Sequence, residues 1–136
     1  MKTIEKYYDN TEKIPPRKNV KTFIEMKNNV GKAIELGCGA GADTAYLIKN
    51  GWEVLAIDQN DTKERIMEKL NSEEQKRFRF QKQKFEEIVL EKNNLIVANF
   101  SLPFCDKNKF EEVWNKIIES ILSNRTFCRK LLWNKR

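Results

Sequence analysis

Ile34-Glu-Leu-Gly-Cys-Gly-Ala-Gly-Ala42 is the stretch of this sequence that decides the fold. The apolar run over 32–36 ends at a glycine, and a helical pattern over 42–49 begins directly after Gly41. A strand, a glycine turn and a helix in this order are typical of the first unit of a parallel α/β sheet. Because Gly37 and Gly39 carry no Cβ, their backbone can approach a ligand closely, and the turn is therefore a candidate binding site.

The alternation of strands and helices continues beyond this turn. We expect further strands over 53–58, 77–83 and 94–100, and a weaker one over 126–133. The run over 94–100 is almost continuously apolar, as is typical of a strand that is buried on both faces. The chain is therefore predicted to form an α/β fold with a doubly wound, mostly parallel sheet.

Helix boundaries are predicted from capping residues and apolar spacing. Asp61 is expected to cap a helix with Glu64 as its capping-box partner, and Asp106 to cap the longest helix. An apolar stripe at helical spacing follows in that helix, comprising Phe110, Val113, Trp114, Ile117, Ile118, Ile121 and Leu122. After the break at Pro15-Pro16, a short helix is expected to bury Val20, Phe23 and Ile24. We assign residues 1–30 to an N-terminal helical lid and 31–136 to the binding domain.

Composition excludes several classes of protein. The 136 residues fit one domain, and 40% hydrophobic with 34% charged residues is typical of a soluble, cytoplasmic protein without a membrane span. The sequence contains no histidine and no CxxC pair among its three cysteines, so we expect no metal site and no histidine-dependent nucleophile. The net charge of +6 is spread along the chain and mixed with glutamates, and we do not expect nucleic-acid binding.

Charge near the glycine turn indicates which ligand it holds. Asp58 ends the second strand about 20 positions after Gly37, where an acid holds the ribose of a bound nucleotide. The spacing alone also fits a dinucleotide, whose pyrophosphate rests on a helix N-terminus. Glu35 and Asp43 flank the turn, however, and their carboxylates would repel a diphosphate. They favour a nucleoside that carries a positive charge.

With its distal acid, the turn resembles a known family. Glu35-Leu-Gly-Cys-Gly-Ala-Gly41 and Val54-Leu-Ala-Ile-Asp58 resemble motifs I and II of class I methyltransferases that use S-adenosylmethionine (SAM). Asn99-Phe-Ser-Leu-Pro-Phe104 and the long helix are similar to the small bacterial, tellurite-resistance-type subgroup. The resemblance implies a Rossmann-like SAM methyltransferase fold over about residues 5 to 122 and SAM as the cofactor.

The same resemblance implies a set of cofactor-binding residues. Glu35, Gly37 and Gly39 would line the methionine part of SAM, with Cys38 between the glycines as a small buried filler. Asp58 would hold the ribose, with Gln59 beside the adenine. The resemblance also implies that the turn at Phe85 meets the adenine edge and that Asn99 borders the sulfonium and the acceptor. Lys84 departs from the family, in which many members have an acid at this position.

The C-terminal part also departs from the family pattern. No glycine turn follows the long helix, so we expect a chain truncated at its C-terminus, without strands 6 and 7. An unpaired sheet edge would then favour a homo-oligomer. Our prediction is a SAM-dependent methyltransferase acting on a small-molecule acceptor, with no catalytic residue identified. The alternatives are a catalytically inactive SAM-binding domain and an oxidoreductase that binds NAD.

Overall fold

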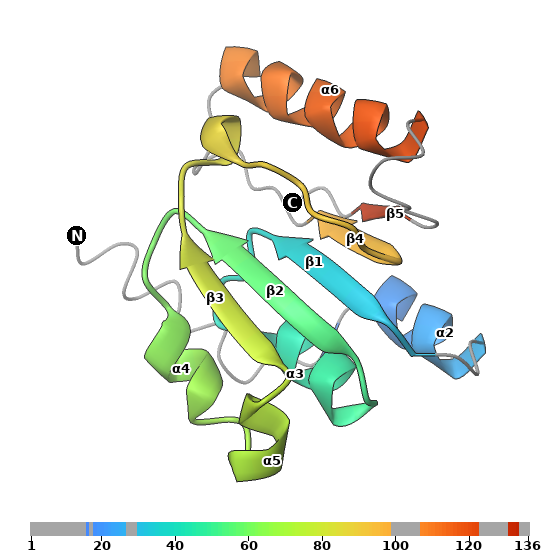
Figure 1. The fold of residues 1–136 in the computed structure, drawn as a ribbon, viewed down its shortest axis with the longest axis vertical. Helices are drawn as coiled ribbons and strands as arrows, with labels where there is room; N and C mark the ends of the chain where they lie inside the picture. The colour runs from blue at the N-terminus through green and yellow to red at the C-terminus, as the bar shows by residue number, and fades with distance from the viewer. Residues whose placement is uncertain (1–15, 17, 27–29, 99–106, 123–130, 134–136) are drawn as a thin grey trace.

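The structure is a computed structural model that describes residues 16, 18–26, 30–98, 107–122 and 131–133 of the chain. Its centre is a five-stranded sheet with the order β3-β2-β1-β4-β5, in which every neighbouring pair is parallel (Figure 1). The strands are β1 (Lys32–Leu36), β2 (Glu53–Asp58), β3 (Phe78–Lys82), β4 (Leu95–Ala98) and β5 (Leu131–Trp133). This architecture confirms the predicted doubly wound α/β fold.

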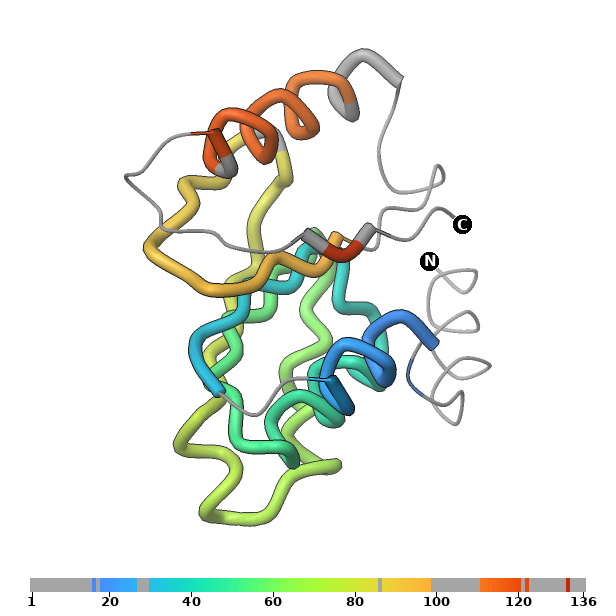
Figure 2. The backbone as a smooth tube through the Cα atoms, turned by 90° about the vertical axis from the view of Figure 1, so that its right-hand side faces the viewer, coloured from blue at the N-terminus to red at the C-terminus, as the bar shows by residue number. Residues whose placement is uncertain are grey.

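Helices lie on both faces of this sheet. They are α2 (Lys18–Met26), α3 (Ala42–Lys49), α4 (Lys63–Met67), α5 (Ser72–Gln75), the 3-10 turn η1 (Phe85–Glu87) and α6 (Lys107–Leu122). Figure 2 shows α6 on one side of the sheet and α2 with α3 on the other. Among the described helices, none combines the length and the apolar character that crossing a bilayer requires.

Two separate cores hold these layers together. On one face, α2, α3 and α4 pack on alternate strand residues such as Val54, Ala56 and Val97. On the other face, α6 and the η1 segment pack on Ile34 and Ile57 with their neighbours. Because both faces are covered, β4 is buried at all four positions, which explains its continuously apolar sequence.

The sheet reverses its winding beside β1. β1 pairs with β2 on one side and with β4 on the other, so that Leu36 lies opposite both Ile57 and Ala98. In an open parallel sheet, ligands bind beyond the carboxyl ends of the strands at this switch point. The turn after β1, which the sequence indicated as a candidate binding site, lies at that point.

The capping box was predicted at the wrong helix. Asp61 accepts a hydrogen bond from the Lys63 amide at 3.2 Å, but the N-cap of α4 is Thr62, which makes no capping bond with its side chain. The complete capping box lies ten residues further on, where the side chains of Asn71 and Glu74 accept each other's amides at 2.8 and 2.9 Å. Asn71-Ser-Glu-Glu74 carries the same pattern, and it marks the start of α5, which we did not predict.

The apolar stripe of α6 is confirmed only in its centre. Val113 and Ile117 are fully buried, whereas Leu122 is 80% exposed, contrary to the prediction. Leu122 is the last residue of the helix, where the packing on the sheet has ended. The expected cap Asp106 and the first residues of the strand expected over 126–133 lie outside the described residues, while β5 forms within the predicted range.

Two features require glycine at position 41: the close approach of a neighbouring helix and the left-handed conformation of its own backbone. Its φ of 90° is left-handed, and a Cβ built there would lie 2.5 Å from Cγ1 of Ile66 in α4. Ile66 is itself fully buried and cannot move away. Gly41 therefore sets the distance between the start of α3 and α4.

Replacing Gly41 by alanine should destabilise the fold by about 2–4 kcal/mol, because left-handed strain adds to a steric clash. Gly51→Ala is the matched control: its φ is 96°, but the nearest atom to its Cβ, Val30 Cγ1, is 3.2 Å away. Urea unfolding of both variants measures the difference. Equal losses at the two positions would show that the contact with Ile66 is unimportant.

Candidate functional site

The glycine turn is joined to β2 by two backbone groups. The Gly37 amide donates to the Ile57 carbonyl at 2.8 Å and so continues the pairing of β1 with β2. The Gly39 amide donates to Oδ2 of Asp58 at 3.0 Å. Gly39 adopts a left-handed φ of 53°, which a residue with a side chain rarely adopts. The turn and the end of β2 thus form one unit.

Asp58 is the polar centre of this unit. Its other oxygen, Oδ1, accepts a hydrogen bond from the Asn60 amide at 2.9 Å, and the residue is only 6% exposed. Burial raises the pKa of this carboxyl above its ordinary value, and the hydrogen bonds from Asn60 and Gly39 oppose the shift. Each carboxylate oxygen can accept a further hydrogen bond, so the group can also hold hydroxyls of a ligand.

Two more buried carboxylates flank the turn. Glu35, the fourth residue of β1, is 1% exposed, and Asp43 in the first turn of α3 is 2% exposed. The hydroxyl of Thr44, which is fully buried, donates to Oε1 of Glu35. Thr44 follows Asp43 in α3, so the helix places this donor against the end of the strand. The structure therefore joins Glu35 to α3 through Thr44, and it buries all three acids that the sequence singled out.

Cys38 is buried beside Asp58. Its Sγ lies 4.0 Å from Oδ2 of Asp58 and 3.8 Å from Oγ1 of Thr62. Burial raises the pKa of the thiol well above its ordinary value, and the negative charges of Asp58 and Glu35 raise it further. The thiol is therefore held in its neutral form, as expected for a filler and not for a nucleophile.

The remaining predicted residues are Gln59, Phe85 and Asn99. Gln59 follows Asp58 at the end of β2 and is partly exposed. Phe85 is 2% exposed and packs in the core on the α6 face, whereas Lys84 before it is exposed. Asn99 lies outside the described residues. Gln59 thus directly follows the carboxylate that the Gly39 amide holds, whereas the Phe85 side chain lies in the core.

Sequence reasoning missed two residues that shape the site. Thr44 was predicted only as part of a helix. The available sequence signal is a hydroxyl at the start of that helix, nine positions after Glu35. Asn60 was not considered, although both its backbone amide and its side chain hydrogen-bond the Asp58 carboxylate. In the part of the chain that the structure describes, no three His, Cys, Asp or Glu residues are grouped to hold a metal ion.

The chain was compared with known proteins. Residues 2–126 match the family of the tellurite resistance protein TehB. None of the curated proteins searched matches the sequence significantly.

Solved structures share the fold at low sequence identity. A putative SAM-dependent methyltransferase from Methanococcus maripaludis is 17% identical with a TM-score of 0.72, and the match covers 98% of this chain and 63% of that one. TehB from Haemophilus influenzae is 19% identical with a TM-score of 0.63, over 76% of this chain and 36% of that one. The glycopeptide N-methyltransferase MtfA in complex with SAM is 16% identical with a TM-score of 0.61, over 74% and 47%. The chain thus spans less than two thirds of the length of these proteins.

Stability should respond to pH through Asp58. Because its pKa is higher in the folded than in the unfolded protein, the folded state retains the proton longer, and stability is lost as pH rises from about 4 through the folded pKa. The slope can reach about 1.4 kcal/mol per pH unit. The free energy of unfolding in urea is measured for wild type and Asp58→Asn at several pH values, and the difference between the two proteins isolates this contribution. A difference that is flat or rises with pH would contradict it.

Proposed function

Because the chain belongs to the TehB family of tellurite resistance proteins, we propose that its glycine turn binds SAM and that the protein transfers the methyl group to a small-molecule acceptor. SAM would lie beyond the carboxyl ends of β1 and β2, at the switch point of the sheet. This placement agrees with the position of the turn and of Asp58.

The observation that carries this proposal is the Asp58 carboxylate. It lies at the end of β2, and the amides of Gly39 and Asn60 hold it in place at 3.0 and 2.9 Å. A carboxylate so oriented can accept hydrogen bonds from both hydroxyls of a ribose. Gln59 follows in the chain, where the adenine would lie.

Charge supports SAM over a dinucleotide. Glu35 and Asp43 are buried at the turn and at the first turn of α3, where a pyrophosphate would have to bind. In a medium of low dielectric constant, two carboxylates repel a diphosphate strongly and attract a sulfonium and an ammonium group. Structures similar to this fold were solved with SAM, sinefungin and S-adenosylhomocysteine.

Methyl transfer from SAM requires few catalytic side chains. SAM, when bound, supplies a methyl carbon on a positively charged sulfur that a nucleophile can attack. The part of the protein is to hold the ribose through Asp58, to keep the carboxylate of Glu35 oriented through Thr44, and to exclude water from the turn. Fixing the two reactants in line supplies most of the rate in such a reaction, so the absence of histidine is no obstacle.

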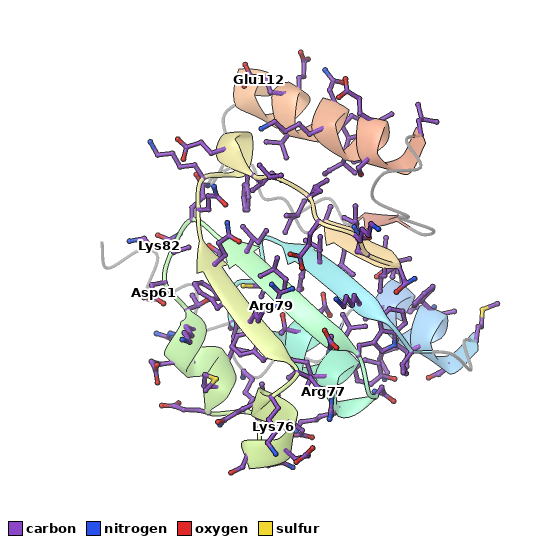
Figure 3. All side chains as sticks on the ribbon, in the orientation of Figure 1. Asp61, Lys76, Arg77, Arg79, Lys82 and Glu112 are labelled. Atoms are coloured by element: carbon purple, nitrogen blue, oxygen red, sulfur yellow. The ribbon has the colours of Figure 1, made fainter. Side chains whose placement is uncertain are left out.

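Calorimetric titration with S-adenosylhomocysteine tests the site directly. We expect saturable binding at one site per chain, and Asp58→Ala should weaken it by at least about 100-fold through the loss of two charge-assisted hydrogen bonds. Asp61→Ala is the matched control, because Asp61 is an exposed aspartate three residues further on (Figure 3) and should leave the affinity unchanged.

The same experiment separates the alternatives. Heat of binding with NAD but none with S-adenosylhomocysteine would overturn the proposal in favour of an oxidoreductase. Binding without methyl transfer to a panel of thiol, amine and oxyanion acceptors would instead indicate a SAM-binding domain without activity.

Thr44→Val tests the role of Glu35. Valine keeps the buried shape but removes the hydroxyl that orients the carboxylate, so we expect S-adenosylhomocysteine to bind about 5- to 20-fold more weakly, and the melting temperature to fall because a buried acceptor loses its donor. Thr62→Val is the control, since it removes a hydroxyl that is also buried but lies against the Cys38 thiol, with Oγ1 3.8 Å from Sγ. Equal affinities of the two variants would assign Thr44 to packing alone.

A further inference from the structure

The outer edge of β3 offers free backbone groups. Within the described residues β3 ends the sheet and pairs only with β2. The Val54 amide donates to the Arg77 carbonyl at 2.9 Å, and the Gln83 amide donates to the Asp58 carbonyl at 3.0 Å. In a parallel ladder such bonds use every second residue of a strand. The N–H and C=O groups of Phe78, Phe80 and Lys82 therefore point away from the sheet.

A groove follows this edge. It has a volume of about 410 Å³ and is lined by Leu55, Lys63, Met67, Gln75, Phe78, Arg79, Phe80 and Gln81. The lining comes from both faces of β3, because Phe78 and Phe80 pack toward α4 while Arg79 and Gln81 lie on the opposite face. A groove that embraces the edge from both faces has the shape that an added strand would fill.

The edge carries a positive charge. Arg79 and Lys82 lie on β3 (Figure 3), and Lys63 of α4 lines the groove beside them. Arg79 contacts Glu91 but leaves 57% of its side chain exposed, and such exposed pairs are weak. Lys82 is exposed, and no ion pair to it is found within the described part of the chain. The positive charge along this edge would therefore attract an acidic partner.

The geometry points to a docking site at this edge for an extended acidic polypeptide segment, which would pair with β3 as an added strand. In such a strand successive side chains face opposite sides. One set would contact Phe78, Phe80 and Met67, and the other set would meet Arg79 and Gln81. The best segment therefore alternates apolar and acidic residues. This inference does not depend on the proposed methyltransferase function.

Charge also argues against a second copy of this chain as the occupant. Two β3 edges side by side would bring Arg79 and Lys82 of each copy close to those of the other, and like charges on paired strands are destabilising. Edge lysines are known to prevent such self-pairing. A purely protective edge, however, needs no groove with an apolar wall.

A labelled peptide of alternating glutamate and valine tests the site by fluorescence anisotropy with the full chain. We expect saturable binding that weakens at high salt, and about tenfold weaker binding to the Arg79→Gln/Lys82→Gln variant. The control Lys18→Gln/Lys21→Gln removes the same charge from exposed positions on α2 and should change the affinity less than twofold.

The backbone contribution is tested separately. Lys82→Pro removes an N–H that the sheet does not use, so it should bind the peptide about fivefold more weakly than Lys82→Gln while keeping its thermal melt. The proposal is overturned if the peptide does not bind, or if a peptide with proline at alternate positions or a DNA oligonucleotide binds equally well. The proposal is also overturned if the chain dimerises without peptide and Lys82→Pro abolishes this dimerisation, because the occupant of the edge would then be a second copy.

Discussion

The hydrogen bond from the Gly39 amide to the Asp58 carboxylate is the interaction on which the rest of this structure depends. It joins the turn after β1 to the end of β2, two segments that the parallel pairing of Leu36 with Ile57 brings side by side. A carboxylate with two backbone amides as donors is fixed in direction. A fixed direction lets the same group position a ligand without further ordering of the chain.

Fixing this carboxylate costs stability, and the fold has to offset that cost. Burial raises the pKa of Asp58 despite its hydrogen bonds, which means that the charged form is disfavoured in the folded protein. Glu35 and Asp43 are buried in the same region. Apolar packing on both faces of the sheet, from Val20 and Val54 on one side to Ile34 and Ile117 on the other, supplies the compensating burial. Concentrated buried charge is typical of a binding site and has no obvious structural purpose.

The two sites inferred here use different properties of the same sheet. At the carboxyl ends of β1 and β2, backbone amides are turned inward to hold a carboxylate. Along β3, backbone groups are turned outward and lie beside a positively charged groove. The distance between α3 and α4 depends on the absence of a side chain at Gly41, and Met67 of α4 lines the groove. Packing at the glycine turn thus also shapes the groove along β3.

The sequence by itself determined the order of strands and helices and the position of the glycine turn. These follow from local signals: apolar runs over 32–36 and 53–58, and glycines where the chain must turn back. It also singled out Glu35, Asp43 and Asp58, because acids at strand ends and in a first helical turn stand out against an apolar background. Only the tertiary structure decided which groups these acids meet. The contacts of Glu35 with Thr44, of Gly41 with Ile66 and of Asp58 with the Asn60 amide depend on how α3 and α4 pack against the strand ends, and periodicity along the chain carries no information about such packing.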